Sequence, residues 1–119
     1  MRASLTASLA SLAAMVAIAA ADAADGFLSR LEDLPLVPGL AEDTSTGVSF
    51  DTAGGRIVEA FARGDLTRHQ VLDFYRETLP QLGWTPESET EFRRGGERLR
   101  LELIQDAQGL IVHYSLSPQ

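Results

Sequence analysis

Two neighbouring segments near the C-terminus, residues 98–103 and residues 110–116, alternate between an apolar and a more polar set of side chains. Successive side chains of a β-strand point to opposite faces of a sheet, so this two-residue period predicts two strands, each with an apolar face. Residues 106–109, Asp-Ala-Gln-Gly, have the composition of a turn. The pair therefore predicts an antiparallel hairpin whose apolar face needs a cover.

Further strands are predicted earlier in the chain. Residues 48–51 predict a short strand, which a glycine-rich turn separates from a second strand over residues 56–62. In the second strand, alternation places Ile57 and Phe61 on one face and small apolar residues on the other. Residues 89–93 give a weaker strand pattern before a Gly-Gly turn.

A helix is predicted between these strands. Thr67 and Gln70 form a capping-box pattern, in which each side chain can bond a free amide of the first turn. The apolar stripe that follows at helical spacing consists of Val71, Leu72, Phe74, Tyr75, Leu79 and Leu82. Pro80 predicts the end of the helix, and Gly83 suits the left-handed position after it. We expect Trp84 to fold back over the last turn.

Together these elements predict an α+β fold: an antiparallel four- to five-stranded sheet with one amphipathic helix across one face, in the order β-β-α-β-β-β. One helix covers only one face, so other apolar residues are left outside, among them Ile57, Phe61, Ile104 and Ile111. We expect residues 27–40 to cover them. Otherwise they form a patch for a partner or a dimer.

The N-terminus predicts a targeting segment. Met1-Arg2 gives a positive start, residues 3–21 follow without a charge, and Ala-x-Ala sites end at Ala21 and Ala23. These are the parts of a cleavable secretory signal, so we expect a periplasmic or secreted protein. An uncleaved membrane anchor and a buried core helix are the alternatives for this segment.

The predicted organisation has three parts. A cleavable signal peptide spans residues 1–23, and a proline-containing segment that packs on the domain spans residues 24–47. The α+β domain spans residues 48–119. Within the middle part, the polar residues 42–47 predict a loop.

Composition excludes several function classes. The 119 residues include ten arginines, no lysine and 17 acidic residues, and a net charge of −7 argues against nucleic acid as a partner. There is no cysteine, and hence no disulfide, thiolate metal site or cysteine nucleophile. The chain contains no Gly-x-Ser-x-Gly elbow, His-Glu-x-x-His helix, P-loop or dinucleotide-binding glycine pattern. We therefore expect no enzyme activity and no cofactor.

The two histidines are the only imidazoles available for acid–base chemistry. His69 is expected on the polar face of the helix start, and His113 on the more polar face of the last strand. Asp65, His69 and Asp73 recur at four-residue spacing, but two carboxylates and one imidazole on an exposed surface rarely bind a metal tightly. We predict no metal site. A small enzyme or metal-binding protein that uses His69, His113 and nearby acids is the alternative.

Arginines gather on one predicted hairpin of this acidic chain, at Arg93, Arg94, Arg98 and Arg100. Such a hairpin could bind a phosphate-bearing lipid headgroup or an acidic partner surface. Glutamates are interleaved with these arginines, so we favour cross-strand Arg–Glu pairing on a solvated face. These four arginines, together with Ile57 and Phe61, are the candidate partner-binding residues.

Three stretches carry a family resemblance: Asp33–Leu40 (DLPLVPGL), Gly55–Val58 (GRIV) and Phe74–Trp84 (FYRETLPQLGW). They resemble small exported alphaproteobacterial proteins of unknown function. The helix that ends in Gly-Trp between hairpins also resembles, in topology, the helix-grip module of outer-membrane assembly lipoproteins. Since no cysteine follows the signal, the membrane tethering of those lipoproteins does not transfer. Neither resemblance implies a functional residue.

We therefore predict an exported, non-catalytic binding or envelope-associated accessory domain. Its expected partner is an envelope protein or a second copy of the chain, and a structural homo-oligomer is a further alternative. Nucleic acid is not an expected partner. The membrane is one only if the signal segment is retained.

Overall fold

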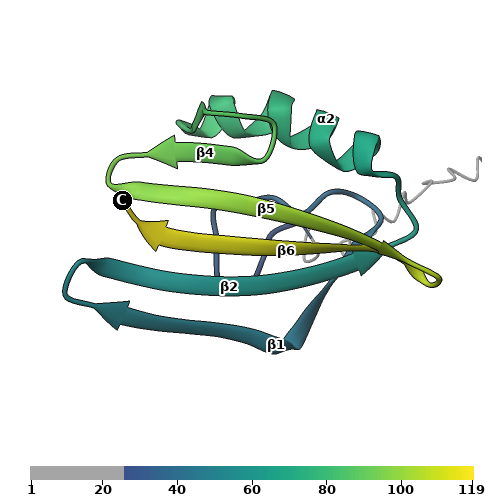
Figure 1. Cartoon of the computed structure of the whole chain (residues 1–119), viewed down its shortest axis with the longest axis horizontal. Coiled ribbons are helices and arrows are strands. Elements are labelled where there is room, and N and C mark those ends of the chain that lie inside the picture. Colours follow the sequence, from purple (N-terminus) through teal and green to yellow (C-terminus); the bar gives the residue numbers. More distant parts are fainter. Residues whose placement is uncertain (1–25) are drawn as a thin grey trace, which may run out of the picture.

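A computed structural model describes residues 26–119, and the predicted signal peptide over residues 1–23 lies outside them. The described chain has an α+β fold, as predicted, with one α-helix and one six-stranded antiparallel sheet (Figure 1). Its elements are β1 (Leu40–Thr52), β2 (Gly55–Gly64), α2 (Arg68–Thr78), the 3-10 helix η1 (Leu79–Leu82), β3 (Thr85–Pro86), β4 (Glu91–Arg94), β5 (Glu97–Asp106) and β6 (Gly109–Pro118).

The strands follow the order β1-β2-β6-β5-β4-β3, and every neighbouring pair is antiparallel. Short turns join β1 to β2, β4 to β5 and β5 to β6. Helix α2 lies on the long connection, which carries the chain from β2 to β3 at the far edge. The chain then returns strand by strand until β6 pairs with β2. Two strands far apart in the sequence thereby become central neighbours.

The sheet has six strands, so the expectation of four or five was wrong. The additional strand is β3, in which Thr85 and Pro86 pair with Arg93 and Phe92 of β4. Proline lacks an amide hydrogen and is tolerated at a sheet edge, where no neighbouring strand needs that donor. A strand of two residues is too short to show a period, so a sequence pattern does not reveal it.

The expectation of a loop over residues 42–47 was also wrong. β1 runs from Leu40 to Thr52 and passes through this stretch and through the expected boundary between residues 47 and 48. Its pairing with β2 shifts register between Asp43 and Val48. The polar residues therefore belong to an irregularity in an edge strand, where a bulge leaves side chains in solvent.

Alternation divides the strand residues between an inner and an outer face, as predicted. On the inner face, the buried residues of β2, β5 and β6 are Val58, Ala60, Ala62, Leu99, Leu101, Leu110, Val112, Tyr114 and Leu116. The helical residues of the same core are Val71, Tyr75 and Leu79. Ile57 and Phe61 of β2 lie on the opposite, outer face and are only partly buried.

The N-terminal segment packs on the inner face, whereas we expected residues 27–40 to cover the outer one. Its buried side chains belong to the same core as α2, and they are Leu28, Leu31, Leu34, Leu36, Val37 and Leu40. In Figure 1 this segment passes behind β5, β6 and β2. Both apolar covers therefore lie on one side of the sheet, and within residues 26–119 the outer face has no cover.

Both ends of the helical region form as the sequence predicts. The Gln70 amide donates to Thr67 Oγ1 at 3.1 Å, and the Thr67 amide donates to Gln70 Oε1 at 2.9 Å. The chain tightens into η1 around Pro80, and Gly83 follows with a φ of 95°. The Trp84 amide donates to a carbonyl of the last turn, and the indole ring is buried.

Two tyrosines join the three parts of the core. The Tyr75 hydroxyl of α2 donates to the Pro35 carbonyl of the N-terminal segment at 2.9 Å and lies 2.7 Å from the Tyr114 hydroxyl of β6. Both side chains are fully buried, and their rings meet edge to face. Because the Tyr75 proton goes to Pro35, Tyr114 is the donor in the bond between the two hydroxyls.

We expect Tyr75→Phe to destabilise the protein more than Tyr114→Phe. The first change leaves both the Pro35 carbonyl and the Tyr114 hydroxyl without a partner, and each unpaired buried group costs about 1–3 kcal/mol. The second removes one bond and keeps the Tyr75–Pro35 bond, for a loss of about 1 kcal/mol. Urea unfolding followed by circular dichroism measures both losses. Equal losses would contradict the donor assignment.

Stability should fall above about pH 10. Burial raises the pKa of Tyr75 and of Tyr114 above the usual tyrosine value. The folded chain then keeps two protons that the unfolded chain releases, so a rising pH favours unfolding. The chain has no other tyrosine, no lysine and no cysteine to titrate in this range. In an alkaline titration, tyrosinate absorbance should appear together with the loss of circular dichroism. Absorbance that precedes unfolding would contradict the prediction.

Candidate functional site

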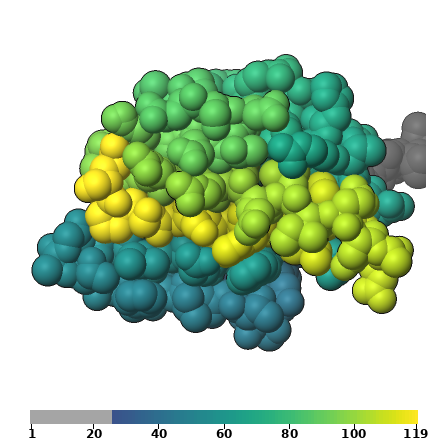
Figure 2. Space-filling model, viewed as in Figure 1, coloured from purple at the N-terminus to yellow at the C-terminus, as the bar shows by residue number. Residues whose placement is uncertain are grey.

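The outer face of the sheet is open to solvent in the described part of the chain, and Figure 2 shows this face. Three of its large apolar side chains are exposed: Val48 and Phe50 on the edge strand β1, and Ile104 on β5. The half-buried apolar residues of the same face are Ile57, Phe61 and Ile111. Several large apolar side chains on one open face are typical of an interaction surface.

His113 of β6 lies on this face and contacts four side chains. Its ring stacks on Phe61 of β2, with centroids 4.3 Å apart and planes 5° apart. Nε2 contacts Glu59 Oε1, and Nδ1 lies 3.3 Å from Glu102 Oε1. Ser115 Oγ lies 3.5 Å from Nε2 and 3.4 Å from both Glu59 oxygens. Register creates this cluster, because His113 pairs with Phe61 on one side and Glu102 on the other.

The cluster brings together the residue types of a nucleophile, a base and an orienting acid, in the order Ser115, His113 and Glu102. However, Glu59 contacts the same nitrogen that would accept the serine proton. Ser115 therefore shares its base with a carboxylate. Carboxylates at both ring nitrogens hold the imidazole in one orientation. The cluster therefore presents polar groups at fixed positions on the surface, as a binding surface requires.

An open groove of about 620 Å³ adjoins the cluster where β1 changes register. Its apolar lining comes from Phe61, Ile104 and Ile111. Arg63 also lines it and pairs with Asp106 at 3.1 Å, which lowers the pKa of that carboxyl. Hydrogen bonds from Ser45 lower the pKa of Asp43, another lining residue. The groove therefore has an apolar lining with ionised groups around it.

The four arginines of the β4–β5 hairpin divide between the two faces. Those that alternate with buried residues onto the outer face are Arg93, Arg98 and Arg100. Arg94 instead lies over the buried Trp84, 4.3 Å from the ring centre, and pairs with Asp33 of the N-terminal segment at 2.5 Å. Arg94 therefore fastens β4 to that segment and is not grouped with the other three.

Acidic partners take up most of this positive charge, as the interleaved sequence predicts. Arg100 pairs directly across the hairpin with Glu91 at 3.1 Å, and Arg93 pairs with Glu87 at 3.4 Å. Arg98 forms no ion pair within residues 26–119, and its Nε atom is buried without a hydrogen-bond partner.

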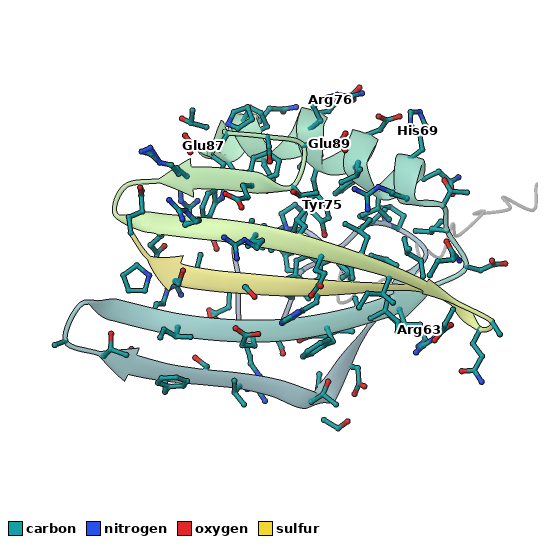
Figure 3. All side chains as sticks on the ribbon, in the orientation of Figure 1. Arg63, His69, Tyr75, Arg76, Glu87 and Glu89 are labelled. Carbon is teal, nitrogen blue, oxygen red and sulfur yellow. The ribbon has the colours of Figure 1, made fainter. Side chains whose placement is uncertain are left out.

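The structure does not bring the two histidines together. His69 lies on the solvent side of α2 (Figure 3) and pairs with Asp73 at 2.9 Å, whereas His113 lies on the outer face of the sheet. Asp65, His69 and Asp73 do not form a metal site. In the described part of the chain, no group of three or more histidine and acidic side chains is arranged to hold a metal ion.

The sequence pattern predicted only part of this surface. It placed Ile57, Phe61 and His113 outside the core, but it missed Glu59 and Glu102 as neighbours of the histidine. The available signal was that both glutamates occupy outward positions of predicted strands. Alternation assigns such residues to a face but does not say which strands lie side by side.

No family model matches this chain, and comparisons with curated proteins and with solved structures also find no match. The resemblance to small exported alphaproteobacterial proteins therefore stays a prediction, as does the likeness to the helix-grip module. Among residues 26–119, no helix is both long enough and apolar enough to cross a membrane.

We expect His113→Ala to cost about 1–2 kcal/mol of stability and His69→Ala less than about 0.5 kcal/mol. The His113 side chain is 21% exposed and supports a stacked ring and two carboxylates, whereas the His69 side chain is 83% exposed on a helix surface. Urea unfolding at neutral pH compares the two variants. Similar losses would mean that His113 does not hold the cluster together.

Proposed function

We propose that this protein is an exported, non-catalytic binding domain of the cell envelope that contacts its partner through the outer face of the sheet. One observation carries the proposal: α2 and the N-terminal segment both pack on the inner face. Val48, Phe50 and Ile104 are left exposed on the other side. Antiparallel sheets often have one solvent-exposed face, but the residues of that face are normally polar, whereas here several are large and apolar.

The composition of the outer face supports binding. Apolar side chains lie at β1 and beside the groove, while the cluster around His113 holds charged and hydroxyl groups between them. Protein interfaces commonly combine an apolar part with fixed polar groups. The net charge of −7 supports a protein partner over nucleic acid.

Export is supported by the N-terminal sequence. The charged start at Met1-Arg2, the uncharged residues 3–21 and the small residues at Ala21 and Ala23 form the pattern of a secretory signal. A protein with this signal would reach the periplasm or the outside of the cell.

Phe50→Glu should abolish capture of the partner, whereas Phe27→Glu should not. The two phenylalanines are matched in exposure, at 53% and 52%, but Phe50 is on the outer face and Phe27 belongs to the segment that packs on the inner face. A charge at Phe50 would have to lose its water to enter an apolar interface. The measurement is a crosslinked pull-down of the tagged full-length precursor from its native envelope fraction, read by mass spectrometry.

One stoichiometric partner that is lost only with Phe50→Glu would support the proposal, provided that circular dichroism shows both variants folded. The mass spectra of the pull-down also identify the N-terminal residue of the bait. A start near Asp22 or Ala24 indicates a cleaved signal, and a start at Met1 or Arg2 indicates a retained anchor. A bait without any partner would overturn the binding function.

A catalytic role of His113 is a second candidate, because Ser115 and Glu102 flank the ring in the order of a catalytic triad. It predicts that the double variant His69→Ala/His113→Ala loses the cellular phenotype and keeps its fold. Since the structure separates the two histidines, His113→Ala alone should have the same effect. Retention of the phenotype would exclude this candidate.

A further inference from the structure

Arg98 differs from most arginines of the described chain. Seven of the nine arginines in residues 26–119 have a carboxylate oxygen within 4.0 Å, and the exceptions are Arg30 and Arg98. Arg30 lines a cavity together with Glu32 and Asp33, so acidic groups are close to it. Arg98 lies on the outer face as the second residue of β5, close to the turn of the hairpin richest in arginine.

The Arg98 side chain is held in place without being neutralised. Its Nε atom is buried and has no acceptor, so the side chain is packed and does not extend freely into solvent. A packed guanidinium loses little conformational freedom when it binds an anion. A partly buried cation without a carboxylate also gains more from an anion than an exposed one does, because solvent screens it less.

The neighbouring strands supply further donors. Arg98 lies directly opposite Arg93 in β4 and opposite Ser117 in β6. Arg93 already pairs with Glu87 and donates its Nε–H to Gln119, so its part in the site is to offer its remaining N–H groups to an anion held by Arg98. Guanidinium groups and hydroxyls are the usual donors to phosphate oxygens.

The acids near this point are already engaged. Glu87 pairs with Arg93, Glu91 pairs with Arg100, and Glu59 contacts His113. Glu87 and Glu91 therefore already have arginine partners, and the arginine of this hairpin without a carboxylate in residues 26–119 is Arg98.

We propose that Arg98, together with Arg93 and Ser117, binds an oxyanion of phosphate type on the outer face. Free phosphate and the phosphate of a lipid headgroup share this chemistry. The site is separate from the exposed apolar residues of β1, and its ligand binds without a protein partner. The oxyanion site and the proposed binding function can therefore fail independently.

The test is an NMR titration of the isotopically labelled protein with inorganic phosphate at constant ionic strength. Saturable shifts should centre on Arg98 and Ser117. Arg98→Gln should weaken phosphate binding by about tenfold or more. Arg76→Gln, which makes the same charge change on the exposed side of α2, should leave it within about twofold. Ser117→Ala removes a donor without changing the charge and should weaken binding roughly threefold, so it carries the test if Arg98→Gln does not fold.

Vesicles distinguish the two sources of phosphate. The protein carries a net charge of −7 and is repelled by an anionic surface, so attachment requires a local site. Attachment to phosphatidylcholine vesicles containing phosphatidylglycerol that is lost with Arg98→Gln would assign a lipid headgroup. Phosphate binding without attachment would assign free phosphate. Absence of both, equal phosphate binding by Arg98→Gln and Arg76→Gln, or attachment that survives Arg98→Gln would overturn the proposal.

Discussion

The buried face of β6 is the surface to which both the helix and the N-terminal segment are fixed. β6 lies between β2 and β5, and its inward side chains from Leu110 to Leu116 are buried. One of them, Tyr114, bonds to Tyr75 of α2, which in turn bonds to Pro35 of the N-terminal segment. A single chain of hydrogen bonds thus fixes the helix and the N-terminal segment on the sheet. The chain has no cysteine, so no disulfide assists this packing.

The position of these two covers decides what the outer face becomes. Because both pack on the inner face, the outer face of the sheet is exposed to water in the described chain. At the centre of the sheet, stacking of Phe61 on His113 and the flanking glutamates reduce the apolar surface that is left exposed. At β1, Val48 and Phe50 remain exposed. Exposed apolar side chains therefore lie on both sides of the polar cluster, at β1 and at Ile104 of β5.

The acidic surface is organised by arginine. Planar guanidinium groups pair with carboxylates in fixed geometries, and here they connect elements: Arg56 joins β2 to Glu97 of β5, and Arg94 joins β4 to Asp33. Burial of these pairs is partial, so each contributes modestly to stability. Arg98 is the outer-face exception, since its position opposite Arg93 leaves it without a carboxylate in the described chain. The other three arginines of this hairpin each have a carboxylate partner, so the unpaired positive charge is confined to Arg98.

Local sequence patterns predict the helix and the two faces of three strands: the two-residue period of β2, β5 and β6, the capping box at Thr67, and the left-handed turn at Gly83. Tertiary structure decided the strand β3, the packing of the N-terminal segment on the inner face, and the neighbours of His113. It also decided the role of Gly64, where a Cβ atom would lie 2.2 Å from the Gly39 carbonyl oxygen. The reason is physical. Alternation and capping follow from backbone geometry within a few residues, whereas strand order and the choice of a cover depend on how distant segments fill one core.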